Sequence, residues 1–456
     1  MTRVQHPLER IVAAGQCMGC GFCTLIRPRT GEDTAPTVTM GYDAEHDHFV
    51  PKVDNWNAGE PTGAFVCPGA EMDMVSLATA VHGREPDDPI LGEVVALRAA
   101  FATDEETRAR SASGGVVPAL LSHLLRSKQI DAAYCLSSAG RPDEARGLVV
   151  RREDDLAAIH GSVYHPARFG TSLAELAEGN ERFAFVGLPC QIAGLEMLKR
   201  EDPALRVRHV MSIGLFCGGI NSFRGIDYYL ARFGLSLRDL ENIDYRYGPW
   251  PGRIRARTRD GADHEIARIR GNSRWNILRY VIAFQGYWML PRCRICPDQV
   301  SDFADIAVGD PHLSRFRKRD GLGFSALVTR TARGEAAVRA ALEEGLLGGE
   351  PITRAEVVES QGYTLDNRRH ARVYARVGRW FGFTPPRIRV YSPLEKSEGW
   401  RHYRYAVVDM MKIRLPDNRF TRMFYLPWQV FEYLFITFAP SLIARRLARL
   451  LRNEKG

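Results

Sequence analysis

Three cysteines separated by two residues each constrain this chain more than any other feature of its sequence. Cys17, Cys20 and Cys23 form a C-x-x-C-x-x-C run, and Pro68 directly follows a fourth cysteine, Cys67. Thiolates at this spacing can bind three corners of a cubane 4Fe–4S cluster, and a remote cysteine before a proline can bind the fourth. A four-thiolate zinc site is the alternative, although zinc more often uses two C-x-x-C pairs. We predict a 4Fe–4S cluster held by these four residues, the first quartet.

Four further cysteines, the second quartet, stand in motifs of their own. Cys190 lies between a strand pattern and a helix pattern, Cys217 ends the next apolar stretch, and Cys293 and Cys296 form a C-x-x-C pair. Because strand ends gather at one edge of an α/β sheet, these thiols can meet there as ligands of a second 4Fe–4S cluster. A catalytic Cys190 thiol beside a small zinc site is the alternative. Cys135 lies inside an apolar strand pattern and is expected to be a buried core thiol.

The apolar segments predict an α/β core with a mixed sheet. Short strand patterns alternate with helix patterns between residues 93 and 347, which favours helices layered on a sheet. Strands are expected at Glu93–Ala100, Asp131–Leu136, Gly147–Val150, Phe183–Val186, Arg208–Phe216, Ala304–Gly309 and Gly323–Thr329, with antiparallel strands within Asn242–Asp263. Helices are expected at Gly114–Arg126, Gln191–Lys199 and Arg333–Leu347.

A serine and two glycines precede the first helix of this core. As a serine N-cap with paired glycines, Ser113, Gly114 and Gly115 would leave backbone N–H groups at the positive end of the helix, where a flavin phosphate or an anionic flavin ring can bind. An ordinary helix cap is the alternative. Ser162 and Tyr164 can add a hydroxyl and an aromatic ring. No G-x-G-x-x-G fingerprint follows the first strand, so nothing in the sequence indicates direct use of a nicotinamide cofactor.

In their order along the chain, these motifs resemble the family of coenzyme F420 hydrogenase/dehydrogenase beta subunits, which includes 7-hydroxymethyl chlorophyll a reductase. The motifs cover about residues 93 to 345: Ser113-Gly114-Gly115, Gly161-Ser162-Val163-Tyr164, Gly187-Leu188-Pro189-Cys190-Gln191, Phe216-Cys217-Gly218, Cys293-x-x-Cys296-Pro297-Asp298 and Ala304-Asp305-Ile306-Ala307-Val308-Gly309-Asp310. The resemblance implies FAD near the Ser-Gly-Gly loop and a 4Fe–4S cluster on the second quartet. It also implies two-electron reactions, with reduced ferredoxin or coenzyme F420 as the other partner.

One position departs from the family pattern. The family's Gly-Ser-Lys-Tyr reads Gly-Ser-Val-Tyr here, so Val163 stands in place of a lysine. Because a valine carries no charge, we expect this position to bind a flavin phosphate or the acidic tail of coenzyme F420 more weakly than a lysine would. Tyr164, His165 and Asp310 are candidates for the catalytic proton donor, because of their positions in these motifs.

The motifs divide the chain into four predicted regions. Residues 1–90 form a loop-rich, ferredoxin-like iron–sulfur arm, 91–175 a flavin-binding region, 176–345 an iron–sulfur and catalytic region, and 346–456 a separate, mainly helical C-terminal extension. Since clusters carry single electrons and a flavin carries two, the flavin would convert between them. We expect an FAD- and 4Fe–4S-dependent oxidoreductase that couples ferredoxin or coenzyme F420 to reduction of a small-molecule or lipid-linked substrate. An electron-transfer subunit of a larger complex and a zinc-stabilised scaffold protein are the alternatives.

Charge and the two chain ends bear on partners and location. The net charge of +8 is spread thinly, which does not predict sequence-specific nucleic-acid binding. The first ten residues lack the apolar segment of a secretory signal, so a cytoplasmic location is expected. Phe424–Phe438 is aromatic but too short to span a membrane. Leu442–Arg452 alternates leucines and arginines at helical spacing, which fits peripheral membrane contact; docking on the protein's own core, a partner subunit or a second copy is the alternative.

Overall fold

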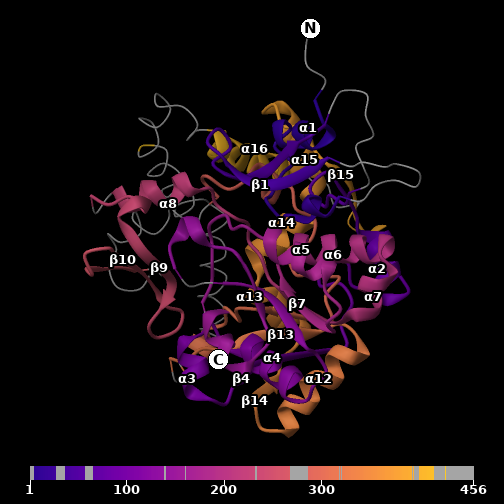
Figure 1. Ribbon diagram of the computed structural model, residues 1–456, viewed down its shortest axis with the longest axis vertical. Helices are drawn as coiled ribbons and strands as arrows, with labels where there is room; N and C mark the ends of the chain where they lie inside the picture. The colour runs from indigo at the N-terminus through magenta and orange to yellow at the C-terminus, as the bar shows by residue number, and fades with distance from the viewer. Residues whose placement is uncertain are drawn as a thin grey trace, which may run out of the picture.

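A mixed sheet of eight strands lies at the centre of the molecule (Figure 1), in the spatial order β14-β4-β13-β12-β8-β7-β5-β6. The computed structural model describes residues 5–26, 36–56, 65–137, 140–159, 161–231, 234–267, 286–317, 319, 321–392, 394, 400–414 and 427. The strands of the sheet are β4 (Ala96–Ala102), β5 (Ala132–Leu136), β6 (Gly147–Val150), β7 (Phe183–Gly187), β8 (His209–Leu215), β12 (Ile306–Gly309), β13 (Ser325–Thr329) and β14 (Leu347–Pro351). The predicted α/β core with a mixed sheet is confirmed.

The middle of this sheet is parallel and its outer strands are antiparallel. Strands β5, β7, β8 and β12 run in one direction. Strand β4 runs the same way, because β4 and β12 are both antiparallel to β13. The carboxyl ends of five strands therefore meet at one edge of the sheet, which is where α/β proteins build their binding sites.

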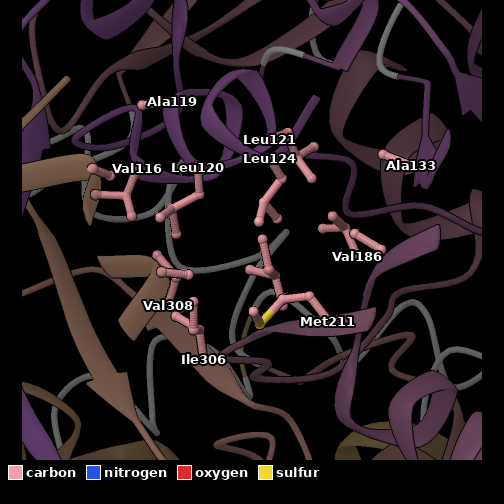
Figure 2. Close-up of a cluster of buried hydrophobic side chains, with 14 of the residues drawn as sticks. Val116, Ala119, Leu120, Leu121, Leu124, Ala133, Val186, Met211, Ile306 and Val308 are labelled. Atoms are coloured by element: carbon pink, nitrogen blue, oxygen red, sulfur yellow. The ribbon is translucent and has the colours of Figure 1, made fainter. Parts of the chain in front are cut away.

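Alternate residues of the central strands point to two different helical layers. On β7, Ala184 and Val186 face α4 (Val116–Arg126) and α12 (Ala332–Glu343), whereas Phe183 and Phe185 face α6 (Pro189–Glu201). Figure 2 shows the first layer, in which Leu120 and other side chains of α4 lie above the strand residues. Each buried leucine or phenylalanine stabilises this packing by about 1.5–3 kcal/mol. The strands were predictable because their side chains are buried on both faces and read as apolar runs.

A smaller antiparallel sheet follows β8. It contains β9 (Leu240–Tyr247), β10 (Arg253–Thr258) and β11 (Asp263–Ala267), in the order β11-β10-β9. This confirms the antiparallel strands predicted within Asn242–Asp263. Shorter helices connect the core elements: α3 (Glu105–Arg110), α5 (Gly170–Glu178), α7 (Pro203–Arg208), α8 (Phe223–Leu230), α10 (Pro291–Arg294) and α11 (Ser314–Arg317), with 3-10 turns at Phe22–Leu25, Pro142–Glu144, Glu153–Ile159 and Leu237–Asp239.

The N-terminal arm contains more regular structure than its loop-rich sequence predicts. It includes α1 (Pro7–Ala13), an antiparallel hairpin of β1 (Thr37–Asp43) and β2 (His48–Asp54), the short strand β3 (Glu71–Asp73), and α2 (Met74–His82). This hairpin was not predicted, although Val38, Met40 and Tyr42 stand at every second position of β1. Such alternation is typical of a half-buried strand.

The described part of the C-terminal extension is mainly helical and packs against the arm. Its elements are α13 (Arg354–Ser360), α14 (Gly362–Arg369), α15 (Ala371–Trp380), β15 (Arg387–Arg389) and α16 (Trp400–Arg414). Strand β15 pairs with β3, so the extension predicted to be separate joins the first ninety residues. Apart from residue 427, Phe424–Phe438 and Leu442–Arg452, with the membrane contact predicted for them, lie outside the described residues. Within the described ranges, no helix is long and apolar enough to cross a membrane.

The helix predicted at Arg333–Leu347 ends earlier than the sequence indicated. Helix α12 ends at Glu343, and Gly345 follows with a φ of 72°. A glycine in this left-handed conformation is a common helix stop. Strand β14 then begins at Leu347. This edge strand was not predicted because its two glycines and its final proline have low strand propensity.

Candidate functional site

A cavity of about 270 Å³ opens at the edge where the parallel strands end. Its walls come from the chain after β5, β7, β8 and β12, from the start of α4, and from the arm. Nine of the residues predicted for a site line it: Cys20, Ser113, Gly115, Ser162, Tyr164, His165, Cys190, Cys217 and Asp310. Segments as far apart in the sequence as Met18 and Ser325 therefore share one cavity.

The Ser-Gly-Gly loop lies where the cavity meets helix α4. Gly115, with a φ of 74°, is the N-cap of α4, and no side chain caps the helix. The expected serine cap is wrong, because the Ser113 hydroxyl donates to the carbonyl of Phe324 instead. An added Cβ on Gly114 would lie 2.5 Å from the carbonyl oxygen of Ala100. The loop is therefore packed tightly against the sheet. The first residues of α4, which no side chain caps, line the cavity, and their backbone N–H groups could bind an anion there.

The first quartet gathers in the arm. Burial raises the pKa of Cys20 to about 12, and the charge of Cys67 adds to the rise. Burial also raises the pKa of Cys23, with further increases from the other three thiols. Backbone N–H groups approach the sulfurs, among them those of Gly69 and Ala70 at Cys67. Such N–H groups stabilise the negative charge of thiolates that bind a metal cluster.

The second quartet gathers beneath the cavity. Cys190 lies in the first turn of α6, Cys217 follows β8, and the C-x-x-C pair starts in α10. Burial raises the pKa of Cys190 well above its usual range, and the charges of Cys20 and then of the rest of its own quartet add to the rise. The Gly219 N–H donates to Cys217 Sγ at 3.4 Å. Cys20 of the first quartet and Cys190 and Cys217 of the second line the same cavity, so the two quartets meet there.

The chemistry of the thiols fits iron–sulfur clusters. All eight are free thiols. Among the described residues, no three cysteine, histidine or carboxylate side chains converge as ligands of one metal ion. A single tetrahedral zinc would hold its sulfurs about 3.8 Å apart, given a Zn–S bond of about 2.3 Å. In a cubane each thiolate binds a different iron atom, so the ligands surround a larger volume.

An ion pair that the sequence did not reveal lies at the wall of the cavity. Arg246 donates two hydrogen bonds to the Asp310 carboxylate, at 2.7 and 2.9 Å, and a longer one of 3.4 Å to the Tyr164 hydroxyl. Burial lowers the pKa of Arg246, but the charges of Asp310 and Tyr164 and the hydrogen bonds to both residues together raise this pKa above its usual value. The indole of Trp250 also donates to Asp310, at 3.3 Å.

Arg246 was missed because a β-bulge changes which way its side chain faces. The register of β9 and β10 shifts between Arg253 and Arg255, so that both Tyr245 and Arg246 are buried. Strict alternation would bury only one of them. An arginine between two tyrosines carries no other sequence signal.

His165 is placed as a structural residue rather than an acid. Its Nδ1 lies 2.7 Å from the Tyr245 hydroxyl, and its ring stacks on Phe223. Burial lowers the pKa of His165 to about 3, so the imidazole is neutral near pH 7 and a weak proton donor. The remaining candidates, Tyr164 and Asp310, both contact Arg246. Cys135 is buried in the core, with 2% of its surface exposed, as predicted.

The fold and cavity define a mixed α/β protein with a thiol-rich site at the carboxyl edge of its sheet. The sequence model for the "Coenzyme F420 hydrogenase/dehydrogenase, beta subunit N-term" matches residues 97–174, and the model for the C terminus of the same beta subunit matches residues 180–355. Together they span more than half of the chain, which therefore belongs to this family. The resemblance predicted from the motifs is confirmed.

Individual relatives carry names that refer to coenzyme F420. The coenzyme F420 hydrogenase subunit beta of Methanothermobacter thermautotrophicus is 24% identical over 277 residues, covering 58% of this chain and 86% of the relative. One of the subunits of the F(420)H(2) dehydrogenase of Methanosarcina mazei is 24% identical over 307 residues, covering 66% and 77%. A coenzyme F420-dependent sulfite reductase of Methanocaldococcus jannaschii is 25% identical over 252 residues, covering 51% of this chain and 35% of that protein.

A solved structure shares the fold. A chain from the F420-reducing [NiFe] hydrogenase complex of Methanosarcina barkeri superposes with a TM-score of 0.51 and 19% identity, over 66% of this chain and 97% of that chain. At this identity the similarity concerns the fold alone. The family matches leave residues 1–96, which hold the first quartet, outside their range.

Proposed function

We propose that this chain is an iron–sulfur flavoprotein oxidoreductase. In this proposal FAD binds in the cavity and each quartet holds one 4Fe–4S cluster. A ferredoxin-type carrier or coenzyme F420 exchanges electrons with a substrate that is reduced by two electrons. One observation carries the proposal: the Ser-Gly-Gly loop, Cys20 of the first quartet and Cys190 of the second line the same cavity.

The chain's own residues have separate tasks at this site. The start of α4 and the Ser113 loop would hold an anionic part of the flavin, and the two quartets would hold the clusters. Bound FAD would supply the exchange between single electrons and two-electron chemistry. Arg246 pairs with Asp310 and donates to the Tyr164 hydroxyl oxygen, which orients that hydroxyl to donate its own proton. Tyr164 is therefore the proton donor that we favour.

The names of the relatives support a second function. Two of them are subunits of F420-dependent hydrogenases or dehydrogenases. This chain can therefore also serve as an electron-transfer subunit that passes electrons to a partner protein. A subunit alone would reduce dyes but no metabolite, whereas an enzyme would turn over its own substrate in a screen. Because Val163 replaces the family's lysine, we expect reduced ferredoxin to support either activity better than coenzyme F420 does.

Metal and flavin analysis of protein purified anaerobically tests the proposal. We expect about eight irons and about one FAD per chain, which correspond to two complete clusters. A colourless protein with zinc in place of iron would leave only the zinc-stabilised scaffold.

Substitution of Cys190 tests the path of the electrons. In Cys190→Ser we expect carrier-linked turnover to fall at least about a hundredfold, because the second cluster would lose a ligand. Cys135→Ser is the control for loss of a thiol at this cavity, because Cys135 also lines the cavity but belongs to neither quartet. Full turnover in Cys190→Ser with full iron content would contradict the proposed relay.

A further inference from the structure

Arg292 joins the two quartets. It directly precedes Cys293 in α10, and only 1% of its surface is exposed. Its Nε donates to the carbonyl of Gly69 at 2.8 Å and one Nη to that of Pro68 at 3.0 Å. The other Nη donates to the carbonyl of Ile295 at 3.2 Å. One guanidinium thus bonds the loop after Cys67 to the loop of the C-x-x-C pair.

The three hydrogen bonds leave the charge of Arg292 without an anionic partner. Other fully buried arginines have one: Arg368 pairs with Asp302, Arg330 lies 3.9 Å from the same carboxylate, and Arg294 lies 3.4 Å from Asp409. No carboxylate within the described ranges pairs with Arg292, whose partners are all backbone carbonyls. A buried charge is strongly unfavourable unless an opposite charge compensates it. Something else must supply the negative charge.

The cysteines are the anionic groups within reach. Arg292 directly precedes Cys293, and its guanidinium bonds the carbonyl of Pro68, which follows Cys67, and that of Ile295, which precedes Cys296. When four thiolates bind a cubane, their charge outweighs that of the core, so the occupied site is anionic and becomes more so on reduction. Two such sites on opposite sides of Arg292 would supply the missing counter-charge.

We propose that Arg292 is the shared counter-ion of the two cluster sites, and that it favours the reduced state of both while tying their loops together. This inference rests on the proposed function, because it requires a cluster on each quartet. A fixed positive charge between two sites stabilises an added electron on either one. Net charge is one of the factors that set cluster potentials. Arg292 acts as a positioning residue and touches no substrate.

Redox titration of the holoprotein, followed by EPR, tests this role in Arg292→Gln and Arg292→Lys. In Arg292→Gln we expect the reduction equilibrium of both clusters to shift about tenfold toward the oxidised form, or about 59 mV for one electron. In Arg292→Lys the charge remains, so the reduction equilibrium constants of both clusters should stay within about threefold of wild type.

Arg294→Gln is the matched control from the same loop. The Arg294 guanidinium lies 3.4 Å from the carboxylate of Asp409, which balances its charge. We therefore expect the potential of the first cluster to be unchanged in Arg294→Gln.

Three results would overturn the assignment. One is Arg292→Gln with full iron and unchanged potentials, and another is a shift confined to the second cluster. The third applies where Arg292→Gln does not fold: a tenfold shift of both reduction equilibria toward the oxidised form in Arg292→Lys would exclude charge as the cause. Wild-type protein without iron would instead refute the proposed function itself.

Discussion

Removing the charge of Asp310 should destabilise the protein far more than removing an exposed carboxylate. Asp310 accepts two hydrogen bonds from Arg246, whose side chain is 4% exposed, while that of Asp310 is 14% exposed. In Asp310→Asn the guanidinium would stay buried without a counter-charge. Loss of one partner of a buried ion pair costs about 3–5 kcal/mol. Since the asparagine oxygen can still accept one bond, we expect a loss of about 3 kcal/mol.

Asp87→Asn is the matched control. Asp87 lies 2.6 Å from Arg84, but the two side chains are 89% and 49% exposed. Exposed pairs contribute about 1 kcal/mol at most, because water screens them. Anaerobic urea denaturation at pH 7, followed by tryptophan fluorescence, measures both variants, and Trp250 reports directly on the altered pair. Equal losses of unfolding free energy in the two variants would refute the reasoning.

Two further predictions concern the loop and the response to acid. Gly114→Ala places a Cβ 2.5 Å from a backbone carbonyl oxygen of β4, so bound FAD should fall at least about tenfold in flavin analysis. Gly362→Ala, whose Cβ meets nothing within 4 Å, should retain it. Burial lowers the pKa of His165 and of His209 to about 3, below the unfolded value of about 6.5. The unfolded chain therefore binds more protons below pH 6.5, and each histidine should cost roughly 1 kcal/mol of stability between pH 7 and 5.5. Urea denaturation of His209→Gln should show a smaller loss of unfolding free energy between pH 7 and 5.5. An unfolding free energy that depends on pH as in the wild-type protein would contradict this prediction.

The sheet and the cysteines could be predicted from the sequence because each leaves a local pattern. Central strands such as Phe183–Gly187 are buried on both faces and read as apolar runs. Cysteines that bind a cluster can be recognised by their spacing in the sequence. Edge strands do not carry such a signal: β14 contains two glycines and a proline.

The residues that connect distant segments could not be predicted. Arg292 bonds a carbonyl 223 residues away in the sequence, and its role depends on a fold that no local pattern encodes. Arg246 faces inward only because of a bulge in its strand. The pairing of β15 with β3 is likewise a contact between segments more than 300 residues apart. It places the C-terminal extension against the N-terminal arm.

The central claim is that two adjacent clusters serve one cavity. EPR of the fully reduced protein, compared with Cys67→Ala, tests it most directly, because neighbouring reduced clusters broaden and split each other's signals. We predict an interacting spectrum in the wild-type protein and the signal of a single isolated cluster in Cys67→Ala. A wild-type spectrum that is the simple sum of two isolated clusters, or that lacks iron–sulfur signals, would contradict the account.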